Sequence, residues 1–152
     1  MVPALLNGAP PGTIGGTSPN GWIDCGLFVK WLQHFIDFVK PSTDDRHLII
    51  MDGHISHKSL EVIELARSSG IDIIILPPHT THRLQPLDRV FFKPLTDNYN
   101  DAADHWMVSN PGRRISFYEV APLFGSAYMK TANVAKAESG FRCTGITGLV
   151  QP

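Results

Sequence analysis

Two short segments of the 152-residue sequence combine residue types that bind metal ions. Each contains one aspartate and a pair of histidines three positions apart. The residues are Asp52, His54 and His57 in DGHISH, and His79, His82 and Asp88 in PPHTTHRLQPLD. Carboxylate oxygens are preferred ligands of Mg²⁺ and Mn²⁺, and Mg²⁺ keeps several waters for substrate phosphate. The two aspartates therefore predict metal-dependent chemistry at a phosphodiester, where metal ions stabilise the attacking and leaving oxygens.

The histidines allow three interpretations. Histidine and aspartate together form zinc sites, so a metal-dependent hydrolase that uses Asp52 and the four histidines is one alternative. Ser56 beside His57 suggests a nucleophile and its base, although no strained-turn motif surrounds the serine. We favour the third interpretation, in which the histidines form hydrogen bonds that hold the two segments in place.

Predicted strands precede both segments. Residues 47–51 and 71–76 are short apolar runs, and residues 59–69 between them have helical spacing. This order predicts a βαβ unit with parallel strands and a right-handed crossover, whose second strand is covered on both faces. The carboxyl ends of parallel strands line the crevice where open α/β sheets bind ligands. We therefore expect Asp52 and Asp88, which follow the two strand exits, to share one edge of the sheet.

The remaining segments predict helices joined by loops. The expected elements are an edge strand at 2–6, a glycine- and proline-rich loop at 7–21, a helix at 27–39, a connector at 77–86, helices at 88–106 and 116–131, and a loop-like tail after Gly140. Pro94 predicts an early break in its helix. Ser116 and Glu119 form a capping-box pattern, while Pro122 is expected to strain the first turns of the same helix. Aromatic residues on these helices are expected to lie in the core.

Composition indicates one ordinary globular domain over residues 1–152, with 43% hydrophobic and 18% charged residues. The two cysteines, Cys25 and Cys143, lie far apart, which argues against a disulfide framework and favours a reducing compartment. No basic residue precedes Lys30, so a secretory signal is not expected. No stretch reaches the roughly 18 apolar residues that a membrane helix needs. We expect a soluble intracellular protein without a membrane partner.

Charge is distributed unevenly along the chain, whose formal net charge is −1. Residues 1–76 carry five Lys/Arg and eight Asp/Glu, a balance of −3, whereas residues 77–152 carry eight and six, a balance of +2. The basic groups best suited to an anion are Arg83, Arg89, Lys93, Arg113 and Arg114. The chain as a whole lacks the basic balance of a free-standing nucleic-acid binder.

Four motifs in order carry a resemblance to a known family. They are GW at 21–22, DGHxSH at 52–57, PPHxTHxLQPLD at 77–88 and GFRxTGI at 140–146. Together they resemble the DDE superfamily endonuclease domain of pogo, Tigger and jerky-type transposases, which centromere protein B and related domesticated proteins share. The resemblance covers nearly the whole chain, from about Pro3 to its end.

The resemblance implies a ribonuclease-H-like α/β fold in which three acidic residues bind two Mg²⁺ ions at DNA phosphates. Asp52 matches the second acid and Asp88 the third. The first acid belongs to the opening antiparallel strands, which this sequence lacks, and Asp24 lies beyond the point where those strands end. We therefore expect a truncated fold with a parallel βαβ core, one exposed side of the sheet, weak binding of Mg²⁺ or Mn²⁺, and little or no cleavage by this chain alone.

The resemblance also implies DNA as a partner, a full-length transposase-like chain as a second one, and the nucleus as the location. His54, His57, His79, His82 and Gln85 would line the site, and Arg83, Arg89 and Lys93 would contact nucleic acid. Three alternatives follow for the function. The chain is a nuclease that borrows its first acid from another chain, a domesticated DNA-binding module, or a non-functional transposon remnant.

Overall fold

A computed structural model describes residues 3–146 of the chain. The chain divides into two compact units. The strand unit comprises residues 16–81, and the helical unit comprises residues up to 15 together with those from 82 onward. This division does not test the prediction of a single domain over residues 1–152, which stays a prediction.

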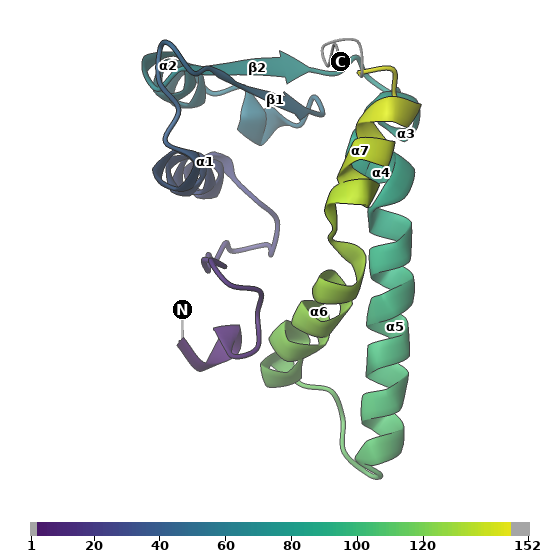
Figure 1. Ribbon diagram of the computed structural model, residues 1–152. Helices are drawn as coiled ribbons and strands as arrows, with labels where there is room; N and C mark the ends of the chain where they lie inside the picture. The colour runs from purple at the N-terminus through teal and green to yellow at the C-terminus, as the bar shows by residue number, and fades with distance from the viewer. Residues whose placement is uncertain (1–2, 147–152) are drawn as a thin grey trace. The chain divides into compact units, whose positions relative to one another are not determined.

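A βαβ motif forms the centre of the strand unit (Figure 1). Strands β1 (His47–Met51) and β2 (Ile71–Ile75) are parallel, and His47 pairs with Ile71 while Met51 pairs with Ile75. Helix α2 (Leu60–Ser68) connects them. The Leu76 amide donates to the Met51 carbonyl at 2.8 Å, which extends the pairing to the end of β1. The predicted parallel βαβ unit is confirmed.

Local capping signals set the ends of both helices in the strand unit. Helix α1 (Cys25–Val39) begins where the Asp24 carboxylate accepts a hydrogen bond from the Leu27 amide at 2.8 Å, and it ends at Lys40 in the left-handed conformation with φ 53°. Helix α2 begins after Ser59, whose hydroxyl accepts from the Val62 amide. Both helices were expected from the spacing of their apolar residues.

The hydrophobic core of the strand unit lies on one face of the sheet. Its buried residues come from α1, α2 and both strands, namely Phe28, Leu32, Met51, Val62, Ala66 and Ile71. The other face is uncovered, because Leu48 is 49% exposed and Ile74 is 47% exposed. The prediction that β2 is covered on both faces is therefore wrong. Its apolar run is continuous, but only alternate residues reach α1 and α2.

The helical unit consists of α-helices and one short 3₁₀ helix. They are η1 (Pro3–Leu6), α4 (Pro86–Val90), α5 (Phe92–Ser109), α6 (Phe117–Thr131) and α7 (Val134–Cys143), with α3 (Thr81–Leu84) entering from the strand unit. Helix α5 packs along α6, α4 packs against α7, and η1 packs against α6 (Figure 1). Among the described residues, no helix is long and apolar enough to cross a membrane.

The predicted break in the long helix occurs at Phe91, between α4 and α5. Pro94 is the third residue of α5. A proline has no N–H for the carbonyl four residues earlier, and its ring clashes with that carbonyl. The carbonyl here belongs to Val90, the last residue of α4. The break therefore falls three residues before the proline that causes it.

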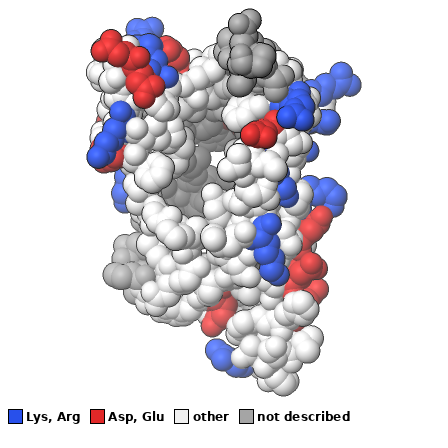
Figure 2. Space-filling model, viewed as in Figure 1, with Lys and Arg blue, Asp and Glu red and all other residues white. Residues whose placement is uncertain are grey.

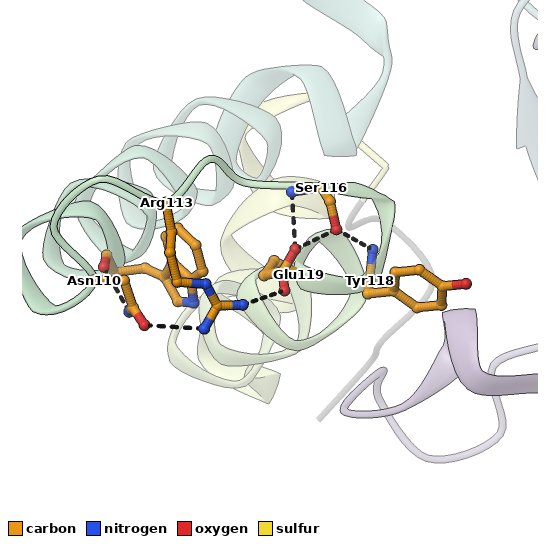
Figure 3. A network of polar contacts seen from close by, with 6 residues as sticks. Asn110, Arg113, Ser116, Tyr118 and Glu119 are labelled. Carbon is orange, nitrogen blue, oxygen red and sulfur yellow. Dashed lines mark hydrogen bonds and ion pairs between the residues drawn. The ribbon is translucent and has the colours of Figure 1, made fainter.

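A network of polar contacts holds the turn between α5 and α6 (Figure 3). The Glu119 carboxylate accepts from the Ser116 amide at 2.8 Å and from the Ser116 hydroxyl at 2.5 Å. Arg113 lies 3.6 Å from the same carboxylate and stacks over the Trp106 ring. Chiefly because of the hydrogen bond from the Ser116 hydroxyl, the pKa of Glu119 is lowered from its ordinary value. The predicted capping box is confirmed.

Two local predictions are wrong. Residues 3–6 form η1 instead of an edge strand, since Pro3 suits a first helical turn and Leu5 and Leu6 are half-buried in the helical unit; Val2 lies outside the described residues. Helix α7 was not expected, and it includes residues 141–143 of the tail. The missed signal was Asn133, whose side chain accepts from the Lys136 amide and caps α7. Residues 147–152 of the tail lie outside the described residues.

Several aromatic side chains expected in the core are exposed. Phe117 is 84% exposed and Tyr118 is 58% exposed at the start of α6, and Phe92 is 44% exposed in α5. First-turn positions such as these have few neighbours on an adjoining helix. The spacing of the two cysteines argued against a disulfide framework, and both are free and exposed.

Candidate functional site

Asp52 lies at the carboxyl end of β1 in the strand unit. The parallel pairing ends at Met51 and Leu76, so Asp52 is the first residue of β1's exit loop. Its side chain is 46% exposed, although Met51 before it is 6% exposed. The chain therefore passes from the core at Met51 to the surface at Asp52.

One oxygen of the Asp52 carboxylate is held by its own loop. Oδ1 accepts a hydrogen bond from the His54 amide at 3.0 Å and lies 3.1 Å from His57 Nδ1. The same His57 nitrogen is 3.1 Å from the Asp52 carbonyl oxygen. Within the described part of the chain, Oδ2 makes no hydrogen bond. Asp52 therefore presents one fixed and one free oxygen.

Ser56 is buried beneath this loop and is 1% exposed. Its hydroxyl lies 2.7 Å from His54 Nδ1, and its amide donates to the same nitrogen at 3.3 Å. Since Ser56 contacts His54 through its hydroxyl and is shielded from solvent, the nucleophile-and-base interpretation with His57 has no geometric support. The interaction instead joins Ser56, the middle residue of η2 (Ile55–His57), to His54, the residue before this helix.

Phe28 supports the loop from below, which the sequence analysis missed. Its ring centroid is 4.4 Å from that of His57, and Phe28 itself is 4% exposed in the core. The available signal was the apolar stripe of α1, which predicts a core residue but does not say which loop it meets. Tertiary packing connects α1 to the segment that carries Asp52.

Asp88 lies in the helical unit, in the first turn of α4. Pro86 begins the helix, a position where its missing N–H costs no hydrogen bond. Gly140 of α7 packs closely here, because a Cβ atom at this position would lie 3.2 Å from Pro86 Cβ. The Asp88 side chain is exposed, and no other described residue pairs with it. Its carboxylate is available to an external ligand.

The two aspartates thus belong to different units, and their pairing at one metal site stays a prediction. No three His, Cys, Asp or Glu side chains between residues 3 and 146 are grouped closely enough to hold a metal ion. His79 precedes α3 and has a left-handed backbone with φ 60°, so it does not share a helical turn with His82. The zinc interpretation therefore gains no support from these residues.

The predicted DNA-contacting residues all lie in the helical unit. Arg89 donates to the His82 carbonyl at 3.5 Å, and Lys93 pairs with Asp97 at 3.0 Å. Arg83, in α3, has no partner among the described residues. Gln85 precedes α4 at the capping position, where its side chain makes no capping hydrogen bond.

The two units differ in charge. Residues 16–81 carry five Lys/Arg and eight Asp/Glu, a balance of −3. The helical unit carries eight and six, a balance of +2. Figure 2 shows its basic side chains spread over the helices among acidic ones, without one continuous basic face in that view. The unit with the basic excess is therefore the one that contains Asp88.

A surface ion pair lies on the sheet of the strand unit, away from the core. Arg46 donates to the Asp72 carboxylate through Nε at 2.9 Å and through Nη2 at 2.6 Å. These hydrogen bonds are the main reason why the pKa of Asp72 is lowered and the pKa of Arg46 is raised. The pair joins the entry of β1 to β2.

Comparison with known families identifies the class of the protein. The family model for the DDE superfamily endonuclease matches residues 16–137, which include both aspartates. The chain belongs to this family. Within it, similarity to pogo transposable elements identifies a pogo-type DDE domain. The resemblance inferred from the four motifs is confirmed.

The curated relatives are much longer than the chain. A protein named "MFS-type transporter clz9" from Cochliobolus lunatus is 35% identical over 133 residues, which are 87% of this chain and 14% of that protein. The "Pogo transposable element with KRAB domain" of Homo sapiens is 28% identical over 90 residues, or 59% of this chain and 15% of that protein. Its Mus musculus counterpart is 27% identical over the same length. No solved structure matches the chain.

The mixed architecture with its small parallel sheet is compatible with an α/β nuclease-like domain. The coarser part of the fold prediction therefore stands. The ribonuclease-H-like topology of the domain is a proposal.

Proposed function

We propose that this chain is the part of a ribonuclease-H-like DDE endonuclease that carries its second and third acids, Asp52 and Asp88, and contacts DNA. The observation that carries the proposal is the position of Asp52, exposed at the end of a parallel strand inside the family match. Cleavage of DNA would also need the first of the three acids, which would have to come from outside this segment. The chain alone would bind DNA without cutting it.

The residues present suit Mg²⁺ or Mn²⁺. Both ions prefer carboxylate oxygens. Asp52 offers a free Oδ2, and Asp88 offers a carboxylate that no described residue engages. Bound metal would stabilise charge on the oxygens of a phosphodiester. The protein's part is to hold Asp52 in one orientation through the His54 amide and the His57 ring.

DNA is the proposed substrate because the family acts on it and because the helical unit has the basic excess. Arg83 is the strongest candidate contact, since it is exposed and no described residue pairs with it. Arg89 makes only a long bond to a carbonyl, so its guanidinium retains donors for phosphate. Lys93 would have to leave Asp97 to bind DNA. We propose a nuclear location on the same similarity to pogo elements.

The transporter named among the relatives does not lead to a second candidate function. The match covers 14% of that protein, so its printed name describes a much longer chain. The pogo elements and the family model agree on a transposase-derived segment.

DNA binding can be tested with fluorescently labelled duplex DNA and the 152-residue chain at low salt. We expect measurable affinity that falls by about fivefold or more when Arg83 and Arg89 are both replaced by alanine, since contacts to charged groups contribute about 1.5–3 kcal/mol each before screening. Lys130→Ala combined with Lys136→Ala, an equal loss of two positive charges on α6 and α7, is the matched control. An equal loss of DNA affinity in both variants would show that only net charge matters. No binding of DNA by the unchanged chain at low salt would refute the proposal.

Cleavage can be tested with supercoiled plasmid in the presence of Mg²⁺ or Mn²⁺. The chain alone should leave the plasmid intact, because the two-metal arrangement lacks one ligand. Addition of a full-length pogo-type transposase carrying an inactivating change at its own second acid should test whether the two chains complement each other. Nicking by this chain alone, abolished by Asp52→Asn, would instead show that two acids are enough.

A further inference from the structure

We propose that His57 is a positioning residue for Asp52, which it holds through a protonated Nδ1, and that His54 has the opposite tautomer. This proposal rests on the proposed function where it concerns metal binding by Asp52. The assignment of the two tautomers stands on the geometry alone.

The environment of His57 requires a proton on Nδ1. This nitrogen is 3.1 Å from the Asp52 carbonyl oxygen and 3.1 Å from Asp52 Oδ1. A carbonyl and an ionised carboxylate are both acceptors only. Two acceptors facing one ring nitrogen are satisfied when that nitrogen donates, so His57 is protonated at Nδ1.

The environment of His54 requires the reverse. The Ser56 backbone amide donates to His54 Nδ1 at 3.3 Å. An amide N–H can only donate, so His54 Nδ1 is an acceptor and its ring proton is on Nε2. The Ser56 hydroxyl, 2.7 Å from the same nitrogen, then donates to it as well. Ser56 is buried, and this interaction satisfies its hydroxyl.

These contacts link the carboxylate to the core through His57. The His57 side chain is 14% exposed, and its ring lies against Phe28, which is 4% exposed. The ring can therefore move little, and its Nδ1–H defines where Asp52 Oδ1 lies. Since the His54 amide donates to the same oxygen, both donors leave Oδ2 free to face a ligand. A donor that orients a ligating carboxylate is a common outer partner of metal sites.

The tautomers can be read directly from long-range ¹H–¹⁵N spectra of the 152-residue chain labelled at histidine. At about pH 8, where ordinary imidazoles are neutral, we expect Nδ1–H for His57 and Nε2–H for His54. An Nε2–H tautomer at His57 would overturn the proposal. This measurement needs neither metal nor DNA, so its result is independent of the proposed function.

A pair of substitutions separates positioning from packing. The amide nitrogen of asparagine falls near the position of Nδ1, whereas that of glutamine reaches the position of Nε2. We expect His57→Asn to keep a single Asp52 side-chain conformation, measured by its scalar couplings, and His57→Gln to average it. Equal averaging in both variants would show that His57 acts only by packing, and the positioning role would be rejected.

The effect on metal binding is read from Mn²⁺ broadening of the amide signals of residues 53–57. We expect His57→Gln to weaken Mn²⁺ binding by about tenfold, as changes in outer partners commonly do, and His57→Asn to restore most of the affinity. If the unchanged chain shows no broadening there, metal binding by Asp52 fails while the tautomer spectra still decide the role of His57. If both variants bind Mn²⁺ as the unchanged chain does, His57 does not position the ligand.

Discussion

Asp52 combines two properties that an isolated strand-end aspartate does not have. Its Oδ1 is held by donors from His54 and His57, and its Oδ2 is free among the described residues. An Asp at this position could simply have capped the following helix, but Ser59 caps α2 instead. The Asp52 carboxylate is therefore not needed to cap α2.

Replacing Asp52 by asparagine should remove Mn²⁺ binding at the loop. We expect affinity to fall by more than about tenfold, because even outer partners of metal ligands account for about 10–100-fold. Mn²⁺ broadening of the amide signals of residues 53–57 measures the change. Asp44→Asn, an equal charge change in the exposed loop before β1, is the control. Undiminished broadening in Asp52→Asn would mean that the metal binds elsewhere.

The ion pair of Arg46 and Asp72 should make stability depend on pH in the acid range. The pKa of Asp72 is lowered in the folded chain, mainly by the hydrogen bonds from Arg46. The folded state therefore gains stability above the unfolded pKa of about 3.9, and this gain is lost as pH falls through the lower folded pKa.

Denaturation of the unchanged chain and of Arg46→Gln at neutral pH and near pH 2 measures this contribution. Arg46→Gln should be slightly less stable than the unchanged chain at neutral pH. This difference in stability should shrink at low pH, because the Asp72 carboxyl is then protonated in both proteins. Both side chains are largely exposed, so the effect is expected to be small. A difference that grows on acidification would contradict the stated direction.

At the scale of elements, α1 stabilises the strand unit through one buried stripe. Leu32 is 0% exposed, whereas Phe38 on the same helix is 81% exposed. We expect Leu32→Ala to cost about 2–5 kcal/mol in the free energy of unfolding, and Phe38→Ala to change it by less than about 0.5 kcal/mol. Chemical denaturation measures both. Similar costs for the two substitutions would show that α1 does not pack as described.

Helix α6 should tolerate no larger residue at Gly125. A Cβ atom there would collide with the carbonyl oxygen of Gly8, whose own backbone has φ 80°. Since backbone cannot give way as a flexible side chain does, Gly125→Ala should destabilise the helical unit by about 1–3 kcal/mol. Ser126→Ala, at the exposed next position, is the control. An increase in melting temperature for Gly125→Ala would refute this packing.

At the scale of the whole molecule, the residues with proposed roles are divided between two units of opposite charge balance. The strand unit holds Asp52 and its supporting histidines, and the helical unit holds Asp88 and the proposed DNA contacts. The family match over residues 16–137 spans both units. Each unit therefore contains one of the two aspartates that we propose as metal ligands.

DNA affinity of the chain should depend on salt according to the few phosphates that it neutralises. If Arg83, Arg89 and Lys93 each contact one phosphate, the logarithm of the association constant should fall against the logarithm of salt concentration with a slope of about −3. Titrations at several salt concentrations measure the slope. A slope near zero would exclude phosphate contacts, and a much steeper one would require basic residues beyond these three.

Local sequence determined the elements whose signals are carried by neighbouring residues. The apolar runs before Asp52 and Pro77 predicted β1 and β2, the helical spacing of residues 59–69 predicted α2, and the Ser116–Glu119 capping box predicted the start of α6. Each signal is carried by residues that are close together in the sequence, so it does not depend on the rest of the chain. The four ordered motifs likewise sufficed to identify the family.

Tertiary structure decided what depends on residues far apart. Composition alone cannot say that Ile74 would be exposed, because the apolar run of β2 is the same whether one face or two are covered. Nor does spacing reveal that Phe28 supports His57, since α1 and the Asp52 loop are brought together only by the shared core. The sequence by itself therefore determined which residues are candidates for the chemistry, and the folded chain determined which oxygen of Asp52 makes no hydrogen bond.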